Sequence, residues 1–171
     1  VKDAFEMGYR CGIVSNSDGH KGRPGASYPG ASLFGAVGGL TCFLMPELTR
    51  PALLDCMRKR RHYATTGGHG GRMLIDVAVT FEHQGTLYHD DPKLGPVDGF
   101  TASSAIIGDI VHLPKGNAEL SVDIVGAAPI ERVDIFNGLE HVETIRPYAQ
   151  EELGNRIRVI WEGAEYRGRF R

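Results

Sequence analysis

Apolar and polar residues alternate in four segments of the second half of the chain, and this period of two constrains the fold most strongly. The alternating apolar residues are Ile75, Val77, Val79 and Phe81, then Leu120, Val122 and Ile124, then Val133 and Ile135, and finally Ile157, Val159 and Trp161. Successive side chains of a β-strand point to opposite faces, so the pattern is typical of strands with one buried face. Asn137–Gly138, between two such segments, predicts a hairpin in which both turn residues have positive φ.

Short antiparallel strands separated by turn signals predict an immunoglobulin-like β-sandwich over residues 71–171, without the Cys…Trp…Cys core of antibody domains. Its core is expected to contain Val77, Val79, Val122, Ile124, Val133, Ile135, Val159 and Trp161. Residues 84–104 are rich in Gly, Pro and Asp and are predicted to form a long loop or insertion.

The first 70 residues have a different pattern. Val1–Gly8 indicates the last turns of a helix closed by Gly8. Cys11–Ser15 is a short apolar run, which predicts a parallel strand buried on both faces, as in α/β proteins. Another apolar segment follows at Leu40–Met45.

A second helix is predicted over about residues 50–61, because Thr49 is a suitable N-cap and Pro51 falls in the first turn. Leu53, Cys56, Met57 and Arg60 are expected to share one face of this helix. His62–Thr66 then indicates a strand, and the glycine-rich Gly67–Gly71 indicates a hinge.

Composition excludes several classes of function. The 171 residues include 19 Lys and Arg against 21 Asp and Glu, a net charge of −2 at pH 7, so no basic surface points to nucleic acid as a partner. No apolar run approaches the roughly 20 residues of a membrane span. The 3 cysteines lack Cys-x-x-Cys spacing, so neither a disulfide framework nor a zinc knuckle is predicted.

The chemistry that stands out is Asp18-Gly-His20, just after the strand predicted at Cys11. In an extended stretch, residues two apart point the same way, so the carboxylate and the imidazole can converge on a metal. A loop aspartate beside an exposed histidine is the commoner origin of such a triplet. Lys21 and Arg23 could hold an anionic substrate such as a phosphate, or they could be two solvated loop cations.

The residues around this triplet resemble one protein family. The resemblance rests on Ser17–Gly25, Ser27–Gly30, Leu48–Arg50 and Arg61–Gly67, and more loosely on Pro129–Gly138 and Ile160–Gly163. Together they are similar to an uncharacterised branch of the polymerase and histidinol phosphatase (PHP) superfamily of distorted β/α barrels with multinuclear metal sites. In that superfamily the final barrel strand ends in a metal-ligating Asp-x-His pair. The resemblance therefore implies that Asp18 and His20 are metal ligands.

The resemblance also implies a domain organisation and a function. Residues 1–70 would be the C-terminal segment of a PHP-like barrel and residues 71–171 the β-sandwich that follows it, an α+β chain. The parent would be a metal-dependent hydrolase, with phosphoesters as the candidate substrate class, and it would hold zinc, manganese or iron, with Lys21 and Arg23 on the substrate. The Gly68–Gly71 run is longer than the linker expected there. The alternative is a non-catalytic β-sandwich module that serves structure or binding.

Most of the family's metal ligands would precede Val1, so we expect this chain to be a fragment that is inactive by itself and holds little or no metal. Its partners would be the missing N-terminal barrel portion and a second copy of the chain. A homodimer is expected because an incomplete barrel would leave the apolar residues Ile13, Val14, Phe43 and Leu44 without neighbours.

Overall fold

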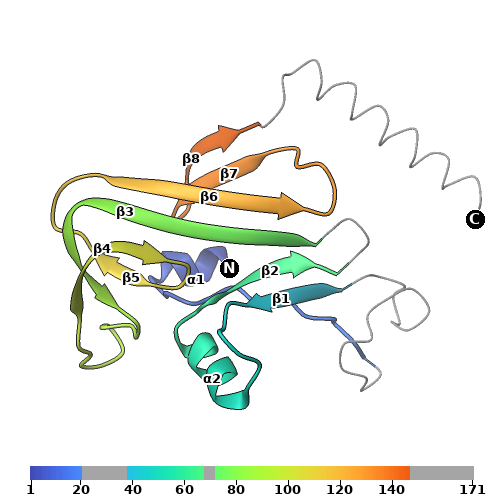
Figure 1. Ribbon diagram of the computed structural model, residues 1–171, viewed down its shortest axis with the longest axis horizontal. Coiled ribbons are helices and arrows are strands. Elements are labelled where there is room, and N and C mark those ends of the chain that lie inside the picture. Colours follow the sequence, from blue (N-terminus) through green and yellow to red (C-terminus); the bar gives the residue numbers. More distant parts are fainter. Residues whose placement is uncertain (21–37, 68–71, 147–171) are drawn as a thin grey trace, which may run out of the picture. The chain divides into compact units, whose positions relative to one another are not determined.

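The computed structural model describes residues 1–20, 38–67 and 72–146 (Figure 1). In chain order the elements are α1 (Lys2–Glu6), β1 (Gly39–Phe43), α2 (Arg50–Arg58), β2 (His62–Thr66), β3 (Met73–Tyr88), β4 (Phe100–Ile106), β5 (Ile110–His112), β6 (Ala118–Gly126), β7 (Val133–Asn137) and β8 (Glu140–Ile145). All strand pairs of the described ranges are antiparallel. The chain is a β-rich α+β protein, which confirms the predicted class at this level.

The described residues form two compact units. Residues 1–9 and 129–146 belong to the smaller unit, and the larger unit takes its residues from 10–128. Of the hinge expected at Gly67–Gly71, residues 68–71 lie outside the described residues. The division into residues 1–70 and 71–171 stays a prediction.

Strand β3 is the centre of the larger unit, because three other strands pair with it (Figure 1). Its first half runs beside β6, with Ile75 opposite Ile124 and Val77 opposite Val122. Its second half lies between β4 and β5. A register shift against β4 separates the two halves, and such irregularities let a long strand bend.

Burial along β3 confirms the period of two. Ile75, Val77 and Val79 are half-buried and Phe81 is buried, whereas Leu74 on the opposite face is 65% exposed. Of the other predicted core residues, Val122, Ile124, Val133 and Ile135 are half-buried, and Val159 and Trp161 lie outside the described residues. The buried cluster itself comprises Phe81, Leu87 and Ala105, with Val79, Ala102, Val111 and Leu113 packed against it.

The long loop predicted over residues 84–104 is wrong at both ends. Strand β3 continues through Tyr88 and β4 begins at Phe100, so only the residues between them lie outside strands. Gly85 is part of β3, at the end of the register shift, where a Cβ would lie 3.1 Å from the carbonyl oxygen of His112. Glycine here reflects close backbone approach in a strand rather than a loop.

The parallel strand predicted at Cys11–Ser15 is also wrong. These residues are not in a strand, and Val14 is 57% exposed. The Thr41 hydroxyl of β1 donates to the carbonyl oxygen of Ser15 at 2.7 Å and accepts from its amide at 3.0 Å. Because one side chain satisfies both backbone groups of Ser15, the segment lies beside β1 without forming a ladder. On its other side β1 pairs with β2, which has the predicted bounds His62–Thr66.

Helix α2 follows its local signals. The Thr49 side chain accepts from the Ala52 amide at 3.3 Å, as an N-cap does, and Pro51 falls in the first turn. The helix ends at Arg58, earlier than predicted. Of the residues expected to share one face, Cys56 is buried and Met57 is 48% exposed.

The Cys56 thiol of α2 faces the backbone carbonyls of Leu44 and Arg61, on either side of the helix in sequence. Its Sγ donates to the carbonyl oxygen of Arg61 at 2.8 Å, and burial raises the pKa of this thiol. A buried thiol that stays protonated is a packing residue rather than a reactive one.

The smaller unit contains α1 and the β7–β8 hairpin. The helix ends at Glu6, with Met7 as its C-cap, and is followed by Gly8 with φ of 79°, which confirms the predicted glycine at its C-terminus. The predicted hairpin is confirmed as well, but its turn residues are Gly138 and Leu139, because Asn137 pairs with Glu140. Of Asn137 and Gly138, the two residues expected to have positive φ, only Gly138 has it, at 62°, so the expectation for Asn137 is wrong.

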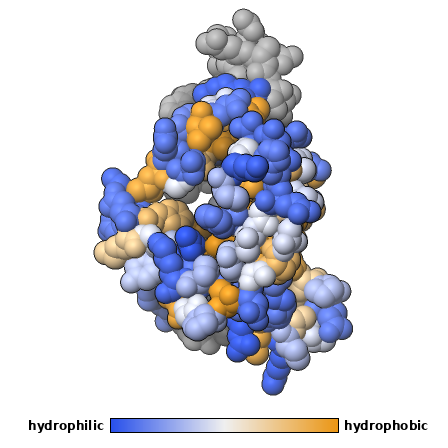
Figure 2. Space-filling view, turned by 90° about the vertical axis from the view of Figure 1, so that its left-hand side faces the viewer, coloured by the Kyte–Doolittle hydropathy of each residue, from blue (hydrophilic) through white to orange (hydrophobic). Residues whose placement is uncertain are grey.

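The described helices are too short and too polar to cross a bilayer. Figure 2 shows one face of the chain, on which apolar residues form separate patches between hydrophilic ones. Such scattered patches are common on protein surfaces and do not by themselves mark an interface.

Candidate functional site

The segment that leads to the Asp-x-His pair is fixed against the β1–β2 hairpin. The His62 Nδ1 donates to the carbonyl oxygen of Ile13 at 3.1 Å, since a carbonyl can only accept. A Cβ at Gly12 would meet the His62 ring, so only glycine lets the segment approach it. At the start of β1, the Gly39 amide donates to the carbonyl oxygen of Asn16 at 2.8 Å. The backbone is therefore held in place two residues before the pair begins.

Asp18 and His20 lie together in a tight turn. The Asp18 amide donates to Asn16 Oδ1 at 3.0 Å, and Asp18 has a left-handed backbone with φ of 49°. The His20 Nδ1 lies 2.8 Å from the carbonyl oxygen of Asp18. Both side chains are exposed. The turn brings the imidazole against the backbone of the residue that carries the carboxylate.

The backbone at this turn differs from the extended conformation that the sequence predicts. The convergence of Asp18 and His20 was expected from an extended backbone, but the backbone at Asp18 is left-handed. The His20 ring instead contacts the Asp18 backbone in a turn that the Asn16 side chain stabilises, and the sequence pattern does not reveal this role of Asn16. Lys21 and Arg23, the predicted substrate-binding residues, lie outside the described residues.

The two side chains have the right chemistry for a divalent metal. Imidazole nitrogen is a good ligand for zinc and iron, and carboxylate oxygen for manganese. Within residues 1–20, 38–67 and 72–146, however, His, Cys, Asp and Glu nowhere gather in groups of three or more that could hold a metal. Divalent sites normally use more than two protein ligands. Asp18 and His20 therefore fit a metal only as part of a larger ligand set.

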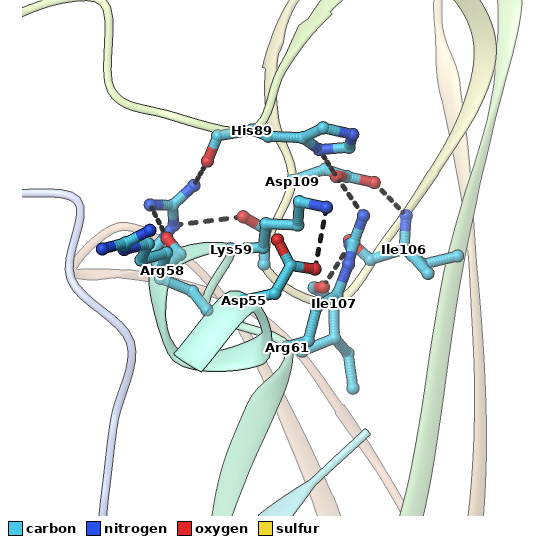
Figure 3. Close-up of polar contacts among 10 residues, drawn as sticks. Asp55, Arg58, Lys59, Arg61, His89, Ile106, Ile107 and Asp109 are labelled. Carbon is cyan, nitrogen blue, oxygen red and sulfur yellow. Dashed lines mark hydrogen bonds and ion pairs between the residues drawn. The ribbon is translucent and has the colours of Figure 1, made fainter. Parts of the chain in front are cut away.

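A second polar cluster lies where α2 meets the sheet (Figure 3). Arg60, just past the helix, has φ of 56°. Its guanidinium donates to the carbonyl oxygen of Gly108 at 3.1 Å, to that of His89 at 2.5 Å and to that of Arg58 at 3.1 Å. A Cβ at Gly108 would overlap the backbone of Arg60. The end of α2 and the β4–β5 turn thus meet at backbone contact.

Arg61 completes this cluster. Its guanidinium pairs with Asp109 at 2.6 Å and donates to the carbonyl oxygen of Ile107 at 2.5 Å. The Asp109 side chain is only 4% exposed, and its second oxygen accepts from the Ile106 amide. The buried Nδ1 of His89 lies 3.4 Å from Asp109 but makes no hydrogen bond within the described part of the chain.

The arginine cluster is a structural clamp. The sequence pattern explains Arg58–Arg61 as cations at a helix C-terminus, but the clamp partners lie up to 48 residues further along the chain. A single sequence carries no signal for that pairing. Each of the two guanidiniums binds backbone carbonyls, and that of Arg61 also binds a buried carboxylate, so their described contacts hold elements together.

Comparisons of this chain with models of protein families, with curated proteins and with solved structures found no significant match.

Proposed function

We propose that this chain is the C-terminal part of a PHP-like metal-dependent hydrolase of phosphoesters, with Asp18 and His20 as two of the metal ligands. The observation that carries the proposal is the turn in which the His20 ring bonds the Asp18 backbone at 2.8 Å. Both ligand types are then exposed on one short turn, with their backbone fixed against β1. The Ser17–Gly25 motif, which resembles the family's, contains the same pair.

Each residue has a defined task in this proposal. Asp18 supplies an anionic oxygen, and His20 supplies a neutral nitrogen whose ring is oriented by a backbone carbonyl. Lys21 and Arg23 neutralise the substrate anion, for which a guanidinium offers paired donors. When bound, the metal (zinc, manganese or iron) supplies a Lewis acid that makes water a nucleophile near neutral pH. The remaining ligands come from outside the described residues.

The proposal includes an architecture. Residues 1–70 belong to the end of a barrel, which the missing N-terminal portion completes, and residues 71–171 form an immunoglobulin-like sandwich. The antiparallel β3–β6 pair, with its alternating burial, supports a sandwich-like sheet. Ile13 and Val14 are 41% and 57% exposed, and such apolar surface supports the proposal that a partner covers it. That partner is either the barrel portion or a second copy of the chain.

The test uses the purified protein that the complete reading frame encodes. Its bound metals are measured by mass spectrometry, and its phosphoesterase activity is measured on p-nitrophenyl phosphate. The expected result is bound zinc, manganese or iron, with metal content and activity both lost in His20→Ala. His83→Ala, an exposed histidine of β3, is the matched control and should keep both. Metal retained in full by His20→Ala would overturn the ligand assignment.

A non-catalytic binding module is the second candidate, and one feature of the β3–β6 sheet favours it. Leu74 and Val125 lie directly opposite each other on these strands, and both are exposed, at 65% and 61%. An apolar cross-strand pair in water is a natural contact for a partner. A complete protein that holds no metal and has no esterase activity would leave this function as the better explanation.

A further inference from the structure

The geometry points to Asn16 as a positioning residue that sets which ring nitrogen of His20 carries the proton. The inference rests on the proposed function for its purpose, but its geometry stands apart from any metal. Three contacts form one chain from the sheet to the imidazole: Gly39 to Asn16, Asn16 to Asp18, and Asp18 to His20.

The first part of this chain fixes the turn. The Asn16 carbonyl accepts a hydrogen bond from the Gly39 amide at 2.8 Å, so the Asn16 backbone has a defined position beside β1. Its Oδ1 accepts from the Asp18 amide at 3.0 Å, which makes an Asx turn. A left-handed backbone costs energy for any residue with a Cβ, and Asp18 adopts it with φ of 49°. The Asn16 hydrogen bond offsets that cost.

The second part fixes the imidazole. The left-handed turn directs the Asp18 carbonyl to His20 Nδ1, at 2.8 Å. A carbonyl oxygen can only accept, so Nδ1 carries the proton in the neutral ring and the lone pair is on Nε2. Metal-binding histidines commonly donate their second ring N–H to a carbonyl in this way, which orients the ring and raises its basicity. Asn16 therefore selects Nε2 as the ligand atom without touching the metal.

The test measures the tautomer of His20 directly. Long-range ¹H–¹⁵N spectra of the 171-residue chain, recorded without metal at about pH 8, report which ring nitrogen is protonated. His20→Ala assigns the signals. The expected result is Nδ1–H in the native chain, a mixture of tautomers and a faster-exchanging Asp18 amide in Asn16→Ala, and recovery in Asn16→Asp, which keeps the acceptor. Ser17→Ala, whose side chain takes no part in these contacts, should leave both readouts unchanged.

The same variants in the complete protein then separate the two claims. Loss of the Asn16 side chain should weaken zinc binding by about tenfold, a typical effect of an outer-shell partner, with recovery in Asn16→Asp. An unchanged tautomer in Asn16→Ala would overturn the inference, whatever the metal content. If the tautomer shifts as expected and the complete protein binds no metal, the turn is as inferred and the proposed function fails.

Discussion

The phenol oxygen of Tyr63 on β2 accepts a hydrogen bond from the backbone amide of Ile75 on β3, at 3.1 Å. It also donates to the carbonyl oxygen of Met73, at 3.1 Å, and the Met73 amide donates to Thr65 Oγ1 at 3.2 Å. Side chains of β2 thus provide hydrogen-bond partners for backbone groups at the start of β3, where β4 does not pair with it. The hairpin extends the sheet without a backbone ladder.

The Tyr63→Phe substitution tests this link. It leaves a backbone donor and a backbone acceptor of β3 without their partner, which typically costs about 1–3 kcal/mol. Urea unfolding should show a loss of that size in the free energy of unfolding. Tyr9→Phe, at a tyrosine that is 59% exposed, should change it little, and equal effects of both substitutions would contradict the role given to the hydroxyl.

The arginine clamp predicts an order among three variants. Arg60→Ala loses the guanidinium bonds and keeps the strained φ of 56°, so it should be the least stable. Arg60→Gly loses the same bonds but relieves the strain, so it should be more stable than the alanine variant by about 1 kcal/mol. Arg60→Lys cannot match the forked donor geometry and should not restore native stability. Thermal unfolding ranks them, and a lysine variant as stable as the native chain would contradict the clamp.

The Arg10–Asp91 pair predicts a pH dependence. The Lys93 amide above all, and then Arg10, hold the pKa of the Asp91 carboxyl below its usual range. A lowered folded-state pKa contributes stability above about pH 4 that is lost as the pH falls through the folded-state value. Arg10→Met should therefore move acid unfolding, followed by circular dichroism, to higher pH.

The control for this shift is an exposed pair elsewhere. Lys2 and Glu6 form an i,i+4 pair at 3.7 Å with both side chains in water, and exposed pairs contribute little. Lys2→Met should leave the acid transition where it is. A shift as large as that of Arg10→Met would show that loss of any cation has the same effect.

Asp76 and Asp123 lie directly opposite each other on β3 and β6, and both are exposed. Like charges at such positions destabilise a sheet. Asp123→Asn should raise the free energy of unfolding by about 0.5 kcal/mol at low salt, and less near 1 M salt where screening is strong. Asp98→Asn, at an exposed position of the loop before β4, should give no gain. A gain that does not depend on salt would exclude charge repulsion as its cause.

The exposed apolar residues near β1 predict self-association. Sedimentation equilibrium at micromolar concentration should show a dimer of the chain, and Val14→Glu should convert it to a monomer, because a charge cannot enter an apolar contact cheaply. Leu94→Glu changes a residue that is 84% exposed in another loop and should leave the dimer intact. A native chain that sediments as a monomer would refute the prediction.

Local sequence signals predict those elements that neighbouring residues in the sequence determine. Thr49 and Pro51 are sufficient to place the start of α2, and the alternation along β3 is sufficient to show its buried face. The Cys11–Ser15 prediction failed because the fate of that segment depends on Thr41, 26 residues from Ser15. Its apolar composition indicates burial but not which partner satisfies its backbone.

The candidate site also has one part that local sequence predicts and one part that depends on other contacts. The Asp18–His20 motif is visible in the sequence, since it is a matter of residue type and spacing. The turn that joins the two residues depends on the Asn16 side chain, which the expectation of an extended strand left out. The end of α2 could not have been predicted either, because Arg60 is held by a carbonyl 48 residues away.

The clamp also has a consequence for the order in which the chain can fold during synthesis. Arg60 and Arg61 leave the ribosome 48 residues before Gly108 and Asp109, which hold them. At ribosomal speeds of about 5–20 residues per second, that interval is roughly 2–10 seconds, far longer than a hairpin needs to form. The β1–β2 hairpin and α2 therefore pass through a period in which two arginines at their junction are hydrated and the joint with the sheet is open.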